Sequence, residues 1–459
     1  MTNDNQNLFK EFAPVSSKQW KQQIQFELKG ADYNDTLVWE SPEGIKVKPF
    51  YHKDEFSASH SITTKATDFK ICQNIFVYDL EKSIARALDS ISRGAESLRF
   101  TIENENTDVA QLLEKLPLQK VPIYFNLHFL SIDFIKKIDE VAKNKQATIF
   151  CNIDPIGQLA SDGNWFKSAE KDNFETLNLL SKQVTNISFL SINAGLYQNA
   201  GANMVQQIAY ALAHANEYFN RLEKIEKPVV FEISVGTNYF FEIAKLRAFR
   251  VLFDLIAKEY NITSGCHLLV SPTKRNKTIY DYNVNMLRTT TECMSAILGG
   301  ADAIANLPYD ALYHKDNEFG DRIARNQLLV LKQESYFDKV DNPADGSYYI
   351  ENITEQLAEK ALVLFKDIEA NDGFLKQLGT GIIKRKIQES ADKEQELFDS
   401  GKEILLGTNK YPNKNDRMQH DMELFPFVKT KPRKTLIQPI IEKRLAEKNE
   451  QERLETEKN

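Results

Sequence analysis

The sequence predicts an α/β protein whose main body is a (β/α)8 barrel. Short apolar runs rich in β-branched and aromatic residues alternate with amphipathic helical patterns from about residue 64 to residue 371, and this alternation predicts a parallel sheet with helical crossovers. The chain has 459 residues, which accommodates a barrel of about 250 residues with additions at both ends. An open, doubly wound sheet is the alternative, although no Gly-x-Gly-x-x-Gly follows the first strands as a dinucleotide site would require.

The composition is that of an ordinary globular protein, with 42% hydrophobic and 27% charged residues. A formal net charge of -7 argues against a general nucleic-acid surface. No apolar run approaches the roughly 18 residues that cross a bilayer, and the opening Met-Thr-Asn-Asp-Asn-Gln-Asn does not resemble a signal peptide. We therefore expect a cytoplasmic protein without membrane or nucleic-acid partners, in which four widely spaced cysteines stay reduced: Cys72, Cys151, Cys266 and Cys293.

Residues 1–55 predict an N-terminal arm made of a helix and a hairpin. Ser16 can cap a helix that ends at Gly30, and residues 37–40 and 45–48 predict two short strands around a Ser-Pro-Glu-Gly turn. A lone hairpin is only marginally stable in water. The apolar side chains of the arm therefore need another surface, either the main body of this chain or a partner protein: Trp20, Phe26, Val38 and Trp39.

Residues 56–371 predict the barrel itself. Seven strands are evident, and the eighth strand that would close the barrel is either residues 70–77 or residues 347–350. The helices between the strands include residues 80–93, 204–222, 238–260 and 285–298. The seven strands are expected at residues 98–102, 122–127, 147–153, 186–192, 229–234, 266–271 and 301–306.

The stretch from Asn285 to Asn306 contains a joint typical of such a barrel. Apolar residues at three- and four-residue steps predict its helix. Gly299 and Gly300 then end this helix, because the residue just past a helix end often adopts a positive φ that glycine tolerates best. The short apolar run that follows predicts a strand buried on both faces.

Residues 372–459 predict a helical extension and a charged tail. Residues 372–405 are rich in Lys, Glu and Gln and mostly helical in pattern, and residues 405–412 form a turn-bearing segment. From Lys429 onward, charges of alternating sign predict an exposed helix or a disordered tail, with a solvated face rather than a binding patch.

Reactive groups of a barrel lie where strands end and helices begin, and several such places hold candidate side chains. Tyr197 and Gln198 follow one strand in a loop that either binds a substrate or only turns the chain. Glu242 and Lys245 are either site residues or an ordinary pair on a helix surface. Two cations at another strand end suit phosphates or acyl-CoA, and one histidine stands just after a strand: Lys274, Arg275 and His128.

The histidines form no metal-binding or catalytic constellation. None of the seven is paired with His or Cys at a metal-ligand spacing, so no zinc site is expected. The sequence has neither a Gly-x-Ser-x-Gly nucleophile elbow nor a phosphate-cradling P-loop. From the residues alone, the prediction is a barrel without a catalytic site.

Several segments together resemble one known family. Asn285–Asn306, Phe319–Gln327 and Asp341–Glu351 are similar, in the same order, to segments of methylmalonyl-CoA mutase. Shorter blocks extend the resemblance from the N-terminal arm through most of residues 60–415: Glu27–Gly30, Thr36–Tyr51, Ala200–Ala202, Glu242–Arg247 and Gly407–Tyr411.

The resemblance implies a (β/α)8 barrel whose axis is threaded by the pantetheine chain of coenzyme A. In this family adenosylcobalamin lies against the C-terminal ends of the strands, carried by a separate flavodoxin-like domain whose Asp-x-His-x-x-Gly histidine ligates cobalt. The family interconverts methylmalonyl-CoA and succinyl-CoA by radical chemistry, a reaction of propionate metabolism. The cofactor performs the difficult step while the protein positions and shields it.

Three departures distinguish this chain from the catalytic members of the family. The catalytic His of the family aligns with Leu196, and its radical-directing Tyr aligns with Asn74. No histidine here has an Asp two residues before it, and the chain ends about where a cobalamin domain would begin. The resemblance therefore implies the small, non-catalytic subunit of a heterodimeric mutase. Such a subunit has no catalytic, cofactor-binding or metal-binding residue of its own, and its large catalytic partner holds adenosylcobalamin.

Two other interpretations remain open at the level of sequence. In the first, the chain is the acyl-CoA-binding barrel of a split cobalamin mutase and takes part directly in catalysis; the loss of the His and the Tyr counts against it. In the second, the chain is an unrelated barrel enzyme with its own small substrate. The long, ordered resemblance counts against that interpretation.

Overall fold

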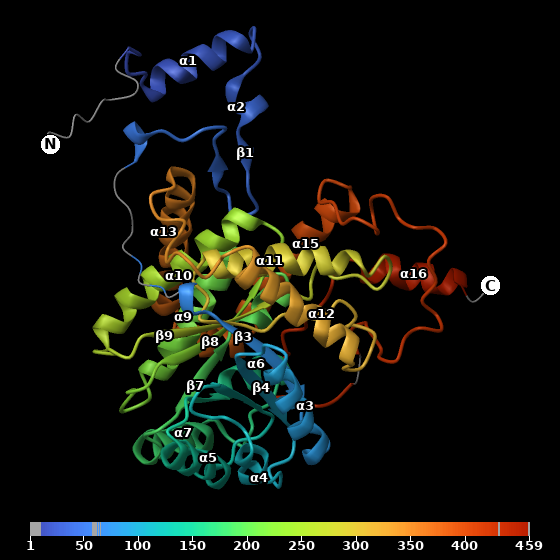
Figure 1. Cartoon of the computed structure of the whole chain (residues 1–459). Helices are drawn as coiled ribbons and strands as arrows, with labels where there is room; N and C mark the ends of the chain where they lie inside the picture. Colours follow the sequence, from blue (N-terminus) through green and yellow to red (C-terminus); the bar gives the residue numbers. More distant parts are fainter. Residues whose placement is uncertain (1–10, 57–61, 63, 65, 430–431, 458–459) are drawn as a thin grey trace, which may run out of the picture.

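The computed structural model describes residues 11–56, 62, 64, 66–429 and 432–457, so His60 and the start of the chain lie outside the described residues. Its centre is a closed barrel of eight parallel strands, which confirms the expected (β/α)8 architecture (Figure 1). Consecutive strands are neighbours, and β10 closes the ring between β9 and β3. The barrel strands are β3 (Lys70–Phe76), β4 (Ser97–Ile102), β5 (Ile123–Leu127), β6 (Ile149–Ile153), β7 (Ser188–Asn193), β8 (Val229–Val235), β9 (Cys266–Pro272) and β10 (Ala303–Ile304).

The structure decides between the two candidates for the eighth strand. β3 confirms the first candidate, residues 70–77. The second candidate, residues 347–350, is wrong because this segment opens the long helix α13 (Tyr348–Ala370). Its aromatic and β-branched start resembles a strand, but apolar side chains then recur at helical spacing and pack against α10 (Tyr239–Glu259).

Helices cover the outside of the barrel, and others extend from both ends of the chain. The expected helices between strands are confirmed, with bounds shifted by a few residues at most. Among the described helices, none combines the length and the apolar character needed to span a membrane. The remaining helices are α1 (Ser17–Glu27), α2 (Tyr33–Leu37), α3 (Leu80–Ser92), α4 (Val109–Glu114), α5 (Ile132–Lys145), α6 (Pro155–Asp162), α7 (Glu170–Gln183), α8 (Gly195–Asn199), α9 (Met204–Phe219), α11 (Val284–Leu298), α12 (Glu318–Leu329), α14 (Gly373–Gly379), α15 (Ile382–Asp399) and α16 (Glu447–Glu457), with short 3-10 turns at Lys53–Glu55 and Ala66–Asp68 and a π-helical turn at Val330–Glu334.

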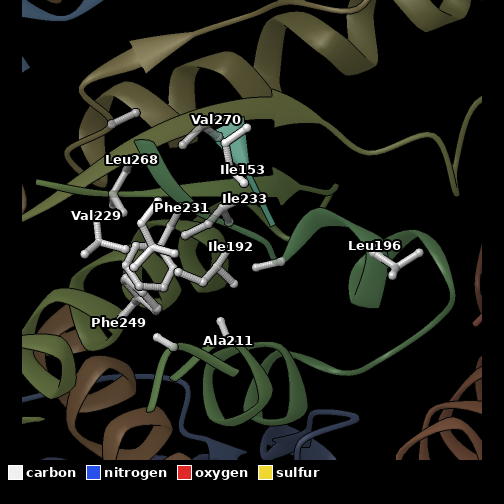
Figure 2. Close-up of a cluster of buried hydrophobic side chains, with 14 of the residues drawn as sticks. Ile153, Ile192, Leu196, Ala211, Val229, Phe231, Ile233, Phe249, Leu268 and Val270 are labelled. Carbon is white, nitrogen blue, oxygen red and sulfur yellow. The ribbon is translucent and has the colours of Figure 1, made fainter. Parts of the chain in front are cut away.

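The main hydrophobic core lies between the barrel strands and the surrounding helices. Figure 2 shows Ile192, Phe231 and Leu268 of the strands grouped with Ala211 and Phe249 of the helices. Phe231 and Phe249 are buried, with ring centroids 4.6 Å apart. Each such side chain contributes about 1.5–3 kcal/mol when it leaves water. Side chains on the outer faces of the strands therefore stabilise the barrel by packing against the helices. Side chains on the inner faces of the strands line the barrel interior.

The predicted joint of helix, glycine turn and strand is confirmed. α11 ends at Leu298, Gly300 has φ +87°, and β10 follows. A Cβ on Gly300 would lie 2.4 Å from Thr64 Cγ2, so close packing and the positive φ both exclude a side chain. β10 is shorter than expected, yet Lys70 N donates to Asp302 O at 3.0 Å on one of its sides. This short strand is sufficient to close the barrel.

The N-terminal arm has the expected helix and hairpin and projects from the barrel (Figure 1, blue). Strands β1 (Trp39–Glu40) and β2 (Lys46–Val47) form an antiparallel pair. The hairpin is anchored because Ile45 belongs to the main core and Trp39 packs edge-on against Phe241 at 5.7 Å. Helix α1 is held by contacts within the arm, where Trp20 stacks on Phe50 at 4.8 Å and Ser17 N donates to Asp54 at 3.0 Å, and Trp20 and Phe26 remain 47% and 79% exposed.

The C-terminal extension contains helices over residues 372–405, and the tail ends in a helix, α16, both as expected. One face of α16 is exposed as expected, but Glu447, Glu450 and Leu454 on its other face are buried, which the sequence did not indicate. Leu445 is buried, Lys443 N donates to Asn199 O at 3.1 Å, and Arg444 forms a buried ion pair with Glu450 at 2.7 Å. The alternating charges in the sequence suggested exposure, but Arg444 and Glu450 pair with each other and are buried together.

Candidate functional site

Side chains from alternate strand positions fill the interior of the barrel. Successive side chains of a strand point to opposite faces, so one set faces the helices and the other faces the barrel axis. Arg99 of β4 pairs with Glu232 of β8, which are not neighbouring strands, so this contact crosses the interior. A second hydrophobic cluster, separate from the main core, gathers inward residues from several strands and from the end of β10: Cys72, Tyr124, Phe150, Val230, Leu269, Ala303 and Ala305.

Three stacked rings close the N-terminal half of the barrel. Tyr124 stacks on Phe150 with ring centroids 4.8 Å apart, and Phe150 stacks on His267 at 4.4 Å. The Tyr124 hydroxyl lies 2.7 Å from His267 Nε2, a hydrogen bond that crosses from β5 to β9. Burial raises the pKa of Tyr124 well above its ordinary value, and burial lowers the pKa of His267. All three rings are therefore uncharged at neutral pH.

An ion pair crosses the axis nearer the C-terminal ends of the strands. The Arg99 guanidinium donates to the Glu232 carboxylate, and Asn152 Nδ2 donates to the other oxygen of Glu232 at 2.7 Å. The side chains of Arg99 and Glu232 are 18% and 14% exposed. The three residues come from alternate strands, as the layers of a packed barrel interior do. The pair neutralises its own charge and leaves no net charge at this level of the axis.

The filled axis limits the chemistry of the interior. A linear pantetheine chain requires an open channel, and the stacked rings and the ion pair occupy that space. Cys72 is the thiol of the inner cluster, and burial raises its pKa to about 12, so it is protonated at neutral pH and is not a nucleophile. Within the described ranges, no group of His, Cys, Asp and Glu side chains is arranged to hold a metal ion.

Leu196 and Asn74 occupy the positions that the resemblance associates with catalysis. Leu196 lies on the short helix α8 directly after β7 and is 3% exposed; Figure 2 shows it apart from the other labelled side chains. Asn74 lies on the same face of β3 as Cys72 and is half-buried. An isobutyl group cannot bind or transfer a proton, and a carboxamide does not titrate. Neither side chain can serve as a general acid or base.

Tyr197 is fully buried and is not available to a substrate. Its hydroxyl lies 2.8 Å from His214 Nδ1, and His214 Nε2 lies 2.9 Å from Asp154 Oδ1. Asp154 also accepts hydrogen bonds from the Tyr218 hydroxyl at 2.6 Å and from Asn193 N at 2.7 Å. Burial opposes ionisation of Asp154, but the contact with His214 and these hydrogen bonds lower its pKa. The chain of bonds anchors α8 and has a structural role.

Glu242 and Lys245 form a buried ion pair and not a surface pair. Their side chains are 0% and 2% exposed, and Lys245 Nζ lies 2.5 Å from Glu242 Oε2. Lys245 also donates to Gln198 Oε1 at 3.1 Å and to Ser234 O at 2.7 Å. Burial lowers the pKa of Lys245, although Glu242 opposes this shift. Gln198 thus links the pair to α8, and it lines a pocket of about 180 Å³ together with Glu242.

The two cations at the end of β9 bind the C-terminal extension. Arg275 is buried and donates to Glu394 of α15 and to Lys443 O, the latter at 2.7 Å. Lys274 Nζ lies 3.5 Å from a carboxylate oxygen of Glu442. Both side chains therefore have protein partners where the sequence suggested phosphates or acyl-CoA. They attach the tail to the loops that follow the barrel strands.

Sequence reasoning missed the groups that fill the barrel. Arg99 and Glu232 are charged residues inside otherwise apolar strands, and this conflict with a buried strand was the available signal. Tyr124 and Phe150 gave no signal, because aromatic residues are common on either face of a strand. His128 stands just after β5 as expected and is exposed.

The sequence of this chain is similar to those of known proteins. The family description "Methylmalonyl-CoA mutase" matches residues 102–456 of this chain. The methylmalonyl-CoA mutase small subunit of Porphyromonas gingivalis is 33% identical over 455 residues, which cover 90% of this chain and 72% of that subunit. The methylmalonyl-CoA mutase small subunit of Streptomyces virginiae is 32% identical over 275 residues, which cover 58% of this chain and 44% of that subunit.

A third relative is longer. The methylmalonyl-CoA mutase of Rhizobium meliloti is 27% identical over 463 residues, which cover 87% of this chain and 64% of that protein, so the chain spans less than two thirds of its length. The family match extends over most of the chain and agrees with the closed barrel found in the structure. The chain belongs to the methylmalonyl-CoA mutase family.

Proposed function

We propose that this chain is the small, non-catalytic subunit of a heterodimeric, adenosylcobalamin-dependent methylmalonyl-CoA mutase. In this role it supports a large subunit that interconverts methylmalonyl-CoA and succinyl-CoA, and it does not turn over substrate itself. Family membership and the similarity to small subunits support the assignment. The observation that carries it is the filled barrel axis.

The filled axis supports a barrel without acyl-CoA. A pantetheine chain on the axis would have to displace Tyr124, Phe150 and His267, which stack on one another and are joined by a hydrogen bond. Displacing a large buried side chain forfeits about 1.5–3 kcal/mol of burial, and the chain would also separate Arg99 from Glu232. This argues against the alternative in which the barrel binds acyl-CoA and takes part directly in catalysis.

The side chains at the catalytic positions support the same conclusion. Leu196 is apolar and buried where catalytic members of the family have a His, and Asn74 stands where they have a Tyr. Groups that act only in the transition state are typically worth orders of magnitude in rate each. The loss of these two groups and the filled axis both favour a barrel that serves as a scaffold and not as a catalyst.

Adenosylcobalamin belongs to the large subunit in this proposal. A lower cobalt ligand must be a histidine with a free ring nitrogen. His214 has both nitrogens engaged, by Tyr197 and Asp154, and His267 faces Tyr124 inside the barrel. The exposed His128 lacks the Asp-x-His pattern. These histidines do not fit the cofactor, and no step of the reaction is assigned to this chain through it.

The N-terminal arm is assigned to contact with the large subunit. Helix α1 projects from the barrel, and it carries exposed aromatic side chains at Trp20 and Phe26 (Figure 1). Exposed aromatic residues are enriched at protein interfaces. The hairpin supplies a fixed base for the helix, because Ile45 and Trp39 pack on the barrel.

The proposal is tested with the purified chain alone and with the chain co-expressed with a large mutase subunit. The isolated chain should give no spectral change with adenosylcobalamin and no mutase activity, and the co-expressed pair should purify together and be active. Turnover or a stoichiometric spectral change with the isolated chain would contradict the proposal. Saturable binding of an acyl-CoA to the isolated chain would favour the split-mutase alternative.

A further inference from the structure

A second cavity lies outside the barrel, between the tail helix α16 and the loop of residues 407–417, which we call the 407–417 loop. Its volume is about 380 Å³, within the range of small-molecule binding sites. The residues that line this cavity include Tyr280, Thr408, Pro412, Lys414, Arg417 and Arg453. None of these residues belongs to the barrel interior or to the candidate catalytic positions.

Three cations face this cavity, and one of them, Arg417, lies close enough to Glu457 for its charge to lower the pKa of that carboxyl. Arg453 donates to the carbonyl oxygens of Asn413 and Asp416, both at 2.7 Å. Arg417 donates to the carbonyl oxygens of Lys414 and Asp416 at 2.9 and 3.0 Å. Among the described residues, neither arginine nor Lys414 forms an ion pair. Their positive charge is available to an anion.

The two carboxylates that line the cavity are already satisfied. Glu450 is buried, pairs with Arg444 at 2.7 Å and accepts a hydrogen bond from Ile279 N at 2.9 Å. Glu457 accepts hydrogen bonds from the Tyr280 hydroxyl at 2.7 Å and from the backbone N–H groups of Met418 and Gln419, both at 3.0 Å, just after the 407–417 loop. Burial disfavours its charge, but these bonds lower the pKa of Glu457. Glu450 is therefore neutralised by Arg444, whereas Glu457 keeps its charge and is outnumbered at the cavity by Lys414, Arg417 and Arg453.

The remaining wall offers an apolar surface and one free hydroxyl. Tyr280 is buried beneath Arg453, whose guanidinium carbon lies 3.9 Å from the ring centroid, and Pro412 stands on the loop side. The stacking holds the Arg453 cation in place at the cavity. The hydroxyl oxygen of Thr408 is buried and has no hydrogen-bond partner among the described residues. Buried polar atoms are rarely left unpaired in folded proteins, so this hydroxyl points to a missing partner.

We propose that this cavity binds a small molecule that carries a phosphate group on a flat apolar body. The phosphate would face Lys414, Arg417 and Arg453, because Arg and Lys donors match phosphate oxygens. The Thr408 hydroxyl would donate to one of these oxygens, and the flat apolar body would lie along Pro412 and against the planar Arg453 guanidinium that covers Tyr280. The tail helix α16 forms one wall, so occupancy of the cavity would also hold the tail against the barrel.

The test uses the full chain, with phenyl phosphate and inorganic phosphate as probes in calorimetric titrations at constant ionic strength. The variant Lys414→Gln/Arg417→Gln removes two exposed cations that line the cavity. The variant Lys410→Gln makes the same change on a neighbouring cation that does not line it. Thr408→Val removes the unpaired hydroxyl at nearly constant volume. Thermal unfolding of each variant without ligand establishes that it is folded.

The proposal predicts saturable binding of one phenyl phosphate per chain. Affinity should fall about tenfold or more in Lys414→Gln/Arg417→Gln, severalfold in Thr408→Val and less than about twofold in Lys410→Gln. Equal affinity in the double variant and the wild type would overturn the site, as would a non-saturable response, which would mean an adventitious ion only. Inorganic phosphate should bind more weakly than phenyl phosphate. Equal affinity of the two probes would contradict the proposal that the ligand carries a flat apolar body.

Discussion

The barrel and the N-terminal arm differ in the exposure of their large aromatic side chains. Inside the barrel, Phe150 is 7% exposed and stacks on both Tyr124 and His267, whose rings also contact each other. On the arm, Phe26 is 79% exposed, and helix α1 has no core beneath it. Burial of a phenylalanine is worth about 1.5–3 kcal/mol. The barrel uses that free energy for its own stability, whereas the arm leaves it available for association.

The difference separates two roles within one chain. The barrel interior is packed with its own side chains and includes an ion pair between Arg99 and Glu232, although Arg99 Nε and Asn152 Oδ1 have no hydrogen-bond partner among the described residues. The arm is anchored at its hairpin, where Ile45 enters the main core, and at Tyr51, which packs against Tyr349, but Phe26 of helix α1 stays exposed. A barrel of this kind serves as a scaffold, and the arm is the part that gains from a partner. Four substitutions test this contrast.

The largest expected effect comes from Phe150→Ala inside the barrel. Truncation of a buried phenylalanine typically costs about 3–5 kcal/mol, because burial is lost and a cavity remains. Here it also removes the stacking contacts with Tyr124 and His267. Urea denaturation of the purified chain measures the free energy of unfolding. A loss below about 1 kcal/mol would show that the axis is not packed as described and would weaken the contrast with the arm.

A smaller loss, about 3 kcal/mol, is expected for Lys245→Met. Removal of one partner of a buried ion pair leaves the other charge uncompensated and typically costs 3–5 kcal/mol. The low end is expected because Glu242 still accepts hydrogen bonds from Gly236 N at 2.7 Å and Gln198 Nε2 at 3.1 Å. The exposed Lys171, which pairs with Glu175 on α7, provides the matched control. Lys171→Met should change stability by less than about 0.5 kcal/mol, and equal losses would contradict the buried pair.

The stacked rings also predict a pH dependence. Burial lowers the pKa of His267 in the folded state, Asp302 opposes this shift, and Arg250 adds to it. The unfolded chain therefore binds a proton more readily, near the ordinary histidine pKa of about 6.5. The contribution of His267 is fully present at neutral pH and is lost as the pH falls below about 6.5, with a slope of at most about 1.4 kcal/mol per pH unit. His267→Gln should flatten this part of the curve of unfolding free energy against pH. An unchanged slope between pH 6.5 and 5 would contradict the assignment.

The sequence alone was sufficient to predict the barrel. It was insufficient to predict which side chains fill the barrel interior. Alternating strand and helix patterns located the strands, and the glycine joint at Gly300 was confirmed. Which face of each strand turns inward could not be derived, because strands buried on both faces show no alternation. The stacking of Tyr124 and the crossing of Arg99 depend on the register of strands far apart in the chain. That information appears only when the barrel is closed.

The predictions for the tail and for several candidate site residues were incomplete for a related reason. Glu242 and Lys245 were expected as site residues or as a pair on a helix surface, and they do pair, but both are buried; Arg444 was expected on a solvated tail and is buried against Glu450. Tyr197 followed a strand as a binding residue would, but it makes a buried hydrogen bond to His214. A single sequence reports the polarity of a side chain and does not report whether that side chain is buried.

The smallest expected effect on stability comes from Phe26→Ala, which is the same chemical change as Phe150→Ala at the opposite extreme of exposure. An exposed side chain loses little burial, so the free energy of unfolding of the isolated chain should change by less than about 0.5 kcal/mol. If the arm contacts the large subunit, the affinity of the two subunits should fall about tenfold or more, because exposed aromatic residues become anchors when an interface covers them. Titration of the labelled large subunit with each variant measures this affinity, and Leu287→Ala, at an exposed position on α11, serves as the control outside the arm. Unchanged affinity with Phe26→Ala would remove α1 from the interface. A large loss of stability in the isolated chain would instead mean that the arm packs on its own barrel, and the contrast between the two regions would disappear.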